Sequence, residues 1–191
     1  MGTRPRNLDD LGYHGQAKTT TVPAASVAGA ERERARAMEA HDRLTTAELL
    51  ALLEIPNDGR MLAFGSSSAV HALEIAAARP DVLIVVCDIE SETTTEVSER
   101  AVAEHLENLV VGDTPAGPLV DRALCIDNLG AIQPAHLITI RTAMLPGGYA
   151  IFVESTAPAA EPLTEKLHGL GYTVADSLDG ALAGSTVIRA R

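Results

Sequence analysis

The stretch MLAFGSSSAVHALEIAAARPDVLIVVCD, residues 61–88, contains the pieces of one folding unit. Residues 61–64 are apolar, predict a short buried strand and lead into Gly65. The run SAVHALEIAAARP (68–80) predicts a helix that ends at a proline. VLIVVCD (82–88) predicts a second strand, and its unbroken apolar run is typical of a sheet covered on both faces. The stretch therefore predicts a strand, a helix and a parallel strand.

Strands and helices continue to alternate after this unit, and a capped helix precedes it, with Thr45 and Glu48 at capping-box spacing. Alternation of this kind predicts a doubly wound, mostly parallel α/β sheet of seven strands. Only the loop LDGALAG (178–184) separates the last two strands, so they should form a C-terminal antiparallel hairpin. The further strands are expected at 108–113, 120–128, 149–155, 172–177 and 185–191, and the further helices at 94–106, 134–145 and 161–171.

Residues 1–44 differ from the rest of the chain. The first 25 residues are polar and rich in Thr, Gly and Pro, without a periodic pattern, and are expected to form a tail. Residues 28–44 alternate charged residues with alanine and predict an exposed helix. We therefore expect an N-terminal tail and helix, able to act as a lid, followed by one Rossmann-like domain over 45–191.

Charge and composition exclude several function classes. The net charge of −11 disfavours binding to nucleic acids and to anionic membranes. MGTRPRNLDD lacks the apolar core of a signal peptide, and no apolar run has the roughly 20 residues of a membrane span. Cys87 and Cys125 lie in or at the end of apolar runs, as buried structural thiols do. A cytoplasmic protein without a metal site is the simplest expectation.

Polar residues follow the predicted strands at the edge where such sheets bind ligands. Gly65 stands where the chain must turn sharply, and Ser66 and Ser67 precede the N-terminus of a helix, which offers free N–H groups. Asp88 comes 23 residues later, near the spacing at which dinucleotide folds place an acid for ribose hydroxyls. Asp113 ends the next strand, where an acceptor can meet an adenine amino group.

These segments resemble the motifs of class I S-adenosylmethionine-dependent methyltransferases. MLAFGSSSA (61–69) resembles the glycine-rich first motif, CDIE (87–90) the segment of the ribose-binding acid, and VVGD (110–113) the segment of the adenine-contacting acid. VDRALCIDN (120–128) resembles the fourth strand, and AMLPGGYAIFVE (143–154) the Leu-x-Pro-Gly-Gly turn and fifth strand. The resemblance implies the same fold and S-adenosylmethionine as cofactor, with S-adenosylhomocysteine as product. The implied cofactor-binding residues are Gly65, Ser66, Ser67, Asp88, Ile89, Asp113 and Thr114.

The first motif departs from the family pattern at three positions. Ala63 stands in place of an acidic residue, and Ser67 and Ala69 stand in place of the second and third glycines. The added side chains narrow the space beside the methionine half of the cofactor. The adenosyl half is therefore better preserved than the methionine half.

Methyl transfer from a sulfonium needs alignment more than a dedicated catalytic group. Asp127 and Asn128, at the end of the fourth strand, are candidates for contacting the acceptor, and a solvated loop is the equal alternative. Tyr13 and His14 are candidates in a lid. Asp127 with Glu154 gives a weaker magnesium alternative. His71 is expected to face the cofactor or solvent, and His105, His136 and His168 are expected to be surface residues.

Two functions follow from this pattern. The leading hypothesis is a methyltransferase that acts on a small molecule, with its cap supplied by residues 1–44 or by a second subunit of a homodimer. The alternative is a methyltransferase-like protein that does not methylate. Such a protein would catalyse another reaction, such as a cyclisation, or bind a partner as a pseudoenzyme.

Overall fold

The computed structural model describes residues 45–126, 132–154, 160–182 and 185–191. Strand and helix alternate over these ranges as the sequence predicts. The helices are α2 (Thr46–Leu53), α3 (Ser66–Ala78), α4 (Ser91–Ala103), α5 (Pro134–Ala143) and α6 (Ala160–Gly169). The strands are β1 (Arg60–Phe64), β2 (Leu83–Cys87), β3 (Leu109–Val111), β4 (Val120–Ile126), β5 (Met144–Glu154), β6 (Val174–Leu182) and β7 (Ser185–Ala190).

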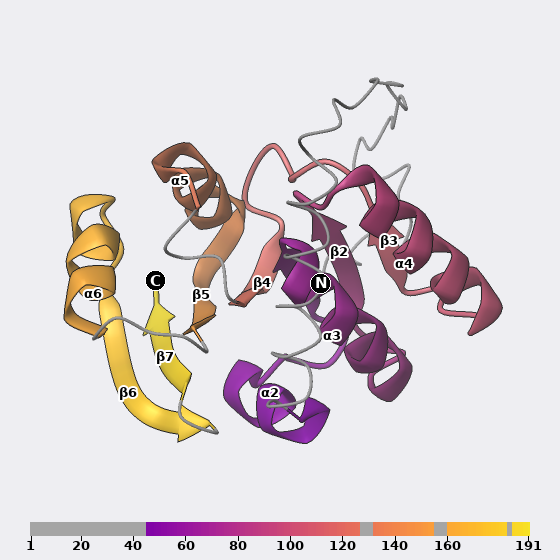
Figure 1. The fold of residues 1–191 in the computed structure, drawn as a ribbon, viewed down its shortest axis with the longest axis horizontal. Helices are drawn as coiled ribbons and strands as arrows, with labels where there is room; N and C mark the ends of the chain where they lie inside the picture. The colour runs from indigo at the N-terminus through magenta and orange to yellow at the C-terminus, as the bar shows by residue number, and fades with distance from the viewer. Residues whose placement is uncertain (1–44, 127–131, 155–159, 183–184) are drawn as a thin grey trace, which may run out of the picture.

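The strands form one sheet in the order β3-β2-β1-β4-β5-β7-β6. The first five strands of this order are parallel, while β7 runs antiparallel to β5 and to β6. Figure 1 shows β6 and β7 at one end of the sheet and β2, β3 and α4 toward the other. The predicted α/β class, the seven mostly parallel strands and the C-terminal antiparallel hairpin are confirmed.

The side chains of the sheet form two cores because they alternate between its faces. On one face, residues such as Ala63, Val86 and Leu124 pack with α2, α3 and α4. On the other, residues such as Phe64 and Phe152 pack with α5 and α6. Both faces are covered, as the unbroken apolar strands predict. Across the described ranges, no helix is long and apolar enough to span a membrane.

The C-terminal hairpin is longer than predicted. Residues 178–182 belong to β6, and the register pairs Asp179 with Thr186 and Leu182 with Ser185. The prediction of a loop starting at residue 178 is therefore wrong. Gly, Ala and Asp have low intrinsic strand preference, but pairing with a neighbouring strand overrides a weak local tendency.

The Pro-Gly-Gly turn lies inside β5, where the pairing with β4 changes register. Gly147 has φ +84°, in the left-handed region. A Cβ on Gly148 would lie 2.8 Å from the carbonyl oxygen of Asp121. The second glycine therefore permits a close approach between the two strands.

Candidate functional site

The two acids predicted to bind ribose and adenine follow neighbouring strands. Val86 of β2 pairs with Val111 of β3, and Asp88 and Asp113 each come two residues later. Adjacent strands lie about 4.8 Å apart, so both acids lie at the same carboxyl edge of the sheet. Asp88 adopts φ +55°, a left-handed conformation that Asp tolerates better than most residues. The chain thus leaves the direction of β2 at this residue.

Both acids line one pocket of about 560 Å³. A pocket of this size is typical of small-molecule and cofactor sites. Its walls come from the carboxyl ends of β1, β2 and β3, from the first turn of α4, from the first two turns of α5, and from the loop after β3. The lining residues are Phe64, Asp88, Ile89, Thr94, Val111, Gly112, Asp113, Thr114, His136 and Thr139.

The charge of this pocket favours ligands that donate hydrogen bonds or carry positive charge. Two carboxylates line it, and the described lining residues include neither Lys nor Arg. A carboxylate can only accept hydrogen bonds, so ribose hydroxyls and an adenine amino group are suitable partners. A phosphate would be repelled.

A buried thiol lies behind the pocket. The hydroxyl of Thr114 donates to Sγ of Cys87, 3.3 Å away. Burial, with the nearby charges of Asp88 and Asp113, raises the pKa of the Cys87 thiol to about 12, although the Thr114 bond opposes this. The thiol therefore stays protonated at neutral pH and acts as a packing group rather than a nucleophile.

His136 belongs to this pocket, although its sequence context predicts a surface residue. Its Nδ1 lies 3.3 Å from Oδ2 of Asp88, and its ring centroid lies 5.6 Å from that of Phe64. About 40% of its side chain is exposed. The side chain is thus partly exposed, as predicted, but the prediction considered the helix alone and did not place His136 at the pocket. The first turn of a helix that follows a parallel strand lies at the ligand-binding edge, and that position is the signal that could have found His136.

The serine loop lies at the junction of β1 and α3. Gly65 adopts φ +85° and its N–H donates to the carbonyl of Cys87, 3.0 Å away. The side chains of Ser66 and Ser67 are buried, and neither is among the residues that line the pocket with Asp88. Ser68 is fully buried, and its hydroxyl accepts from the N–H of Ile126, 3.0 Å away. The described contacts of this loop are therefore contacts within the fold.

Solved structures with the same fold place this arrangement among known proteins. One is an SAM-dependent methyltransferase from Aquifex aeolicus, with TM-score 0.62, 13% identity, and coverage of 78% of this chain and 89% of the other. A second is the [4+2]-cyclase SpnF, with TM-score 0.63, 17% identity, and coverage of 70% and 58%. A third is a 16S rRNA (adenine(1408)-N(1))-methyltransferase from Catenulisporales acidiphilia, with TM-score 0.56, 18% identity, and coverage of 77% and 90%.

The chain has the fold of class I S-adenosylmethionine-dependent methyltransferases. Identities this low support the fold alone, and the chain spans little more than half of the cyclase. No protein-family model matches the sequence, and no curated protein sequence matches it. Fold does not fix function, because one fold carries many activities.

Within this methyltransferase fold, the candidate residues divide into three groups. Asp88, Ile89, Asp113 and Thr114 meet in one pocket. Gly65, Ser66 and Ser67 lie at the start of α3, outside the lining of that pocket. The acceptor and lid candidates, namely Tyr13, His14, Asp127 and Asn128, lie outside the described residues, as does the predicted helix over 28–44.

The burial of His71 and Glu154 bears on two other predictions, namely the side that His71 faces and the magnesium site. His71 is fully buried in α3, so the prediction that it faces the cofactor or solvent is wrong. The reason is that α3 packs against both the sheet and α4, which encloses most of its surface. Glu154 is buried at the end of β5, while its proposed metal partner lies outside the described residues. Among the described residues, no group of three His, Cys, Asp or Glu side chains could hold a metal ion.

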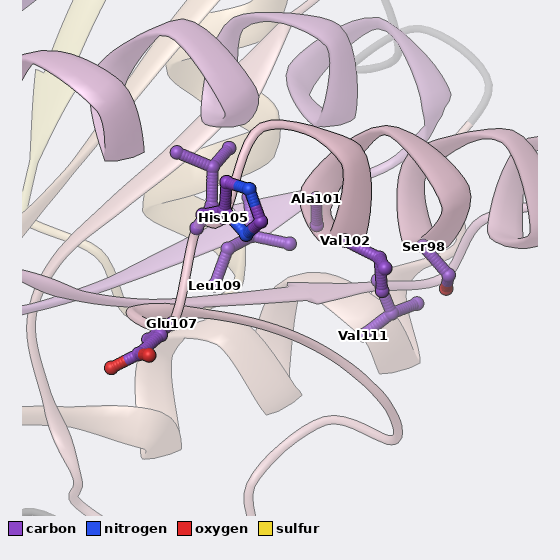
Figure 2. A pocket seen from close by; sticks show the side chains of 8 residues that line it. Ser98, Ala101, Val102, His105, Glu107, Leu109 and Val111 are labelled. Carbon is purple, nitrogen blue, oxygen red and sulfur yellow. The ribbon is translucent and has the colours of Figure 1, made fainter.

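A second hollow of about 400 Å³ lies between α4 and the edge strand β3. Figure 2 shows Ser98, Ala101 and Val102 along α4, with Leu109 and Val111 on the strand beside it. His105 and Glu107 lie in the connection between these elements. Val111 lines both hollows, but the second contains neither of the acids at the carboxyl edge. The candidate cofactor site of the methyltransferase fold is therefore the pocket with Asp88 and Asp113.

Proposed function

We propose that the protein binds S-adenosylmethionine and transfers its methyl group to a small-molecule acceptor. The observation that carries this proposal is the pocket in which Asp88 and Asp113 lie side by side after adjacent parallel strands. The cofactor offers a ribose diol, an adenine amino group and a cationic sulfonium, and all three suit a pocket with two carboxylates. When bound, it supplies an already activated methyl group.

The residues have separate roles in this proposal. Asp88 accepts hydrogen bonds from the ribose hydroxyls, and Asp113 with Thr114 contacts the adenine. Ile89 packs against the base, and Gly65 lets the chain pass close to the cofactor. Ser66 and Ser67 are the family-aligned residues beside the methionine half. Asp127 and Asn128 contact the acceptor, with residues 1–44, including Tyr13 and His14, or a second subunit as the cap.

A small-molecule acceptor is favoured over a nucleic acid by electrostatics. The net charge of −11 repels a phosphate backbone, which dominates the affinity of nucleic-acid-binding proteins. The fold itself does not separate these acceptors, since one of the similar structures is an rRNA methyltransferase. Methyl transfer to labelled small-molecule fractions and to RNA, at low and high salt, would distinguish them.

Calorimetric titration with S-adenosylmethionine and S-adenosylhomocysteine tests the proposal. We expect micromolar binding that weakens by about 10- to 100-fold in Asp88→Ala, because hydrogen bonds to a charged group contribute about 1.5–3 kcal/mol. Asp176→Asn is the matched control, because Asp176 is an exposed acid on β6, at the other end of the sheet. Absence of binding at millimolar ligand would refute the proposal.

A methyltransferase-like protein that does not methylate is the second candidate. The burial of Ser67 and Ala69 supports it, because their side chains stand where the family motif has glycines. The [4+2]-cyclase among the similar structures has the same fold. Such a protein would yield no S-adenosylhomocysteine when offered S-adenosylmethionine and acceptor mixtures, whereas a methyltransferase would accumulate it.

A further inference from the structure

We infer that His136 is a positioning residue that fixes the carboxylate of Asp88 for a ligand with a ribose diol. The inference rests on the proposed adenosyl site and concerns a side chain on α5, a different element from the strand ends that carry the acids. Its basis is the 3.3 Å separation between Nδ1 of His136 and Oδ2 of Asp88, inside the pocket that both residues line.

The imidazole is held from two sides. On one side it meets the Asp88 carboxylate, and on the other it meets the ring of Phe64, tilted by 56° at 5.6 Å. Phe64 is only 1% exposed, so it forms a fixed wall at the end of β1. His136 itself stands in the first turn of α5, whose start is set by Pro134 at the first helical position. The ring is therefore anchored by packing and by the rigid backbone of a helix.

Asp88 needs such an anchor. It lies beyond the end of β2 in a left-handed conformation, and about 39% of its side chain is exposed. A carboxylate in this setting can take several rotamers, and a ligand that requires one of them must order the side chain on binding. The contact of the imidazole with Oδ2 at 3.3 Å favours one orientation of the carboxylate. Oδ1 and the remaining lone pair of Oδ2 stay available for the two ribose hydroxyls.

The expected consequence is specific to the diol. Replacing His136 should weaken ligands that use both hydroxyls, by about fivefold for one side chain that must be ordered again. The replacement should leave the affinity for ligands without those hydroxyls unchanged. A wall residue that only contacts the nucleoside would affect both kinds of ligand equally.

The experiment pairs a ligand change with a protein change. Adenosine and 2′,3′-dideoxyadenosine are titrated by ligand-observed NMR into the full-length protein and into the variants His136→Leu, His136→Asn, Thr142→Ala and Asp88→Ala. Asparagine carries its amide nitrogen on Cγ, as histidine carries Nδ1, so it can keep the donor. Thr142 is exposed on the same helix, which makes its variant the control for general effects on α5.

Support for the inference has three parts. His136→Leu binds adenosine about fivefold more weakly than the wild type and binds the dideoxy compound within twofold. His136→Asn and Thr142→Ala bind both nucleosides like the wild type. In Asp88→Ala, the preference for adenosine over the dideoxy compound disappears.

Two results would overturn the inference while leaving the proposed function intact. If His136→Leu weakens the binding of both nucleosides equally, His136 is only a wall of the pocket. If the affinity for neither nucleoside changes, His136 has no role in the site. If the wild type binds neither nucleoside at millimolar concentration, the adenosyl site itself is refuted and the inference falls with it. The wild-type titration thus separates failure of the inference from failure of the proposed function.

Discussion

Ser68→Ala should destabilise the protein more than its small chemical change suggests. Ser68 lies in the first turn of α3, with its side chain fully buried, and accepts from the backbone N–H of Ile126. Ile126 is the last residue of β4, and β1 beside it has already ended at Phe64. The serine hydroxyl therefore supplies an acceptor where the neighbouring strand no longer offers one.

The magnitude follows from what the substitution leaves behind. The donor–acceptor distance of 3.0 Å is that of a normal hydrogen bond, and Ile126 is only 1% exposed. Alanine removes the acceptor and leaves a buried N–H without a partner, which costs about 1–3 kcal/mol. We expect a loss of about 2 kcal/mol in the free energy of unfolding. For a chain of this size, that loss lowers Tm by about 4–8 °C.

Urea unfolding followed by circular dichroism measures this difference. Since the buried surface is unchanged, the midpoint should shift while the slope of the transition stays constant. Ser67→Ala is the matched control, because Ser67 is a buried neighbour in the same turn for which no hydrogen bond to a described residue is found. A loss below about 0.5 kcal/mol in Ser68→Ala, or an equal loss in the control, would refute the reasoning.

Four further predictions test other parts of the fold. Tyr149→Phe should cost about 1 kcal/mol in unfolding free energy, because the hydroxyl lies 3.0 and 2.7 Å from two carbonyls at the end of α2 that also accept from arginines. Asn108→Ala should cost about 1–3 kcal/mol by the same denaturation assay, because the amide nitrogen lies 2.9–3.1 Å from three backbone carbonyls. Cys87, whose pKa burial raises to about 12, should resist iodoacetamide at pH 8 in the folded protein and react after unfolding, as mass spectrometry would detect. The hydrogen bond from Arg79 lowers the pKa of Asp81 to about 2, so the pair should stabilise the fold above about pH 4 and lose that effect as the pH falls toward 2. Solvent screening limits the effect to below about 1 kcal/mol, and acid titrations of wild type and Asp81→Asn would measure it.

The order of elements was predictable because local signals and the overall fold agree. Apolar runs without alternation gave the parallel strands. The capping box at Thr45 and Glu48 forms as its spacing predicts, with the Thr45 hydroxyl accepting from the Glu48 N–H at 3.3 Å. The Pro-Gly-Gly motif lies in β5, against β4. Each of these features depends on a short stretch of chain, which one sequence can show.

The features that were missed depend on contacts between distant segments. The pairing of β6 with β7 extends β6 to Leu182, and nothing within that segment indicates a strand. His136 reaches the site only because the first turn of α5 lies beside the end of β2, 48 residues earlier in the chain. Phe64 lines the pocket although its apolar context predicts only a core residue. Sequence periodicity shows which side of a helix or strand is apolar. It does not show which distant helix or strand packs against that side.

The first turn of α3 explains why the family's glycines can be absent here. Gly65 is the one position of the loop with positive φ, and glycine is kept there. Ala69 is fully buried within the core formed with α2 and α4, and Ser68 bonds to the end of β4. Ala69 therefore adds packing that a glycine at this position cannot supply, and the neighbouring Ser68 adds a hydrogen bond. The pocket-lining residues at the ends of β2 and β3 lie on other elements than this turn. A packed α3 junction and a pocket lined by Asp88 and Asp113 are thus compatible in one sequence, and binding of the adenosyl half at that pocket is the property on which the proposed function depends.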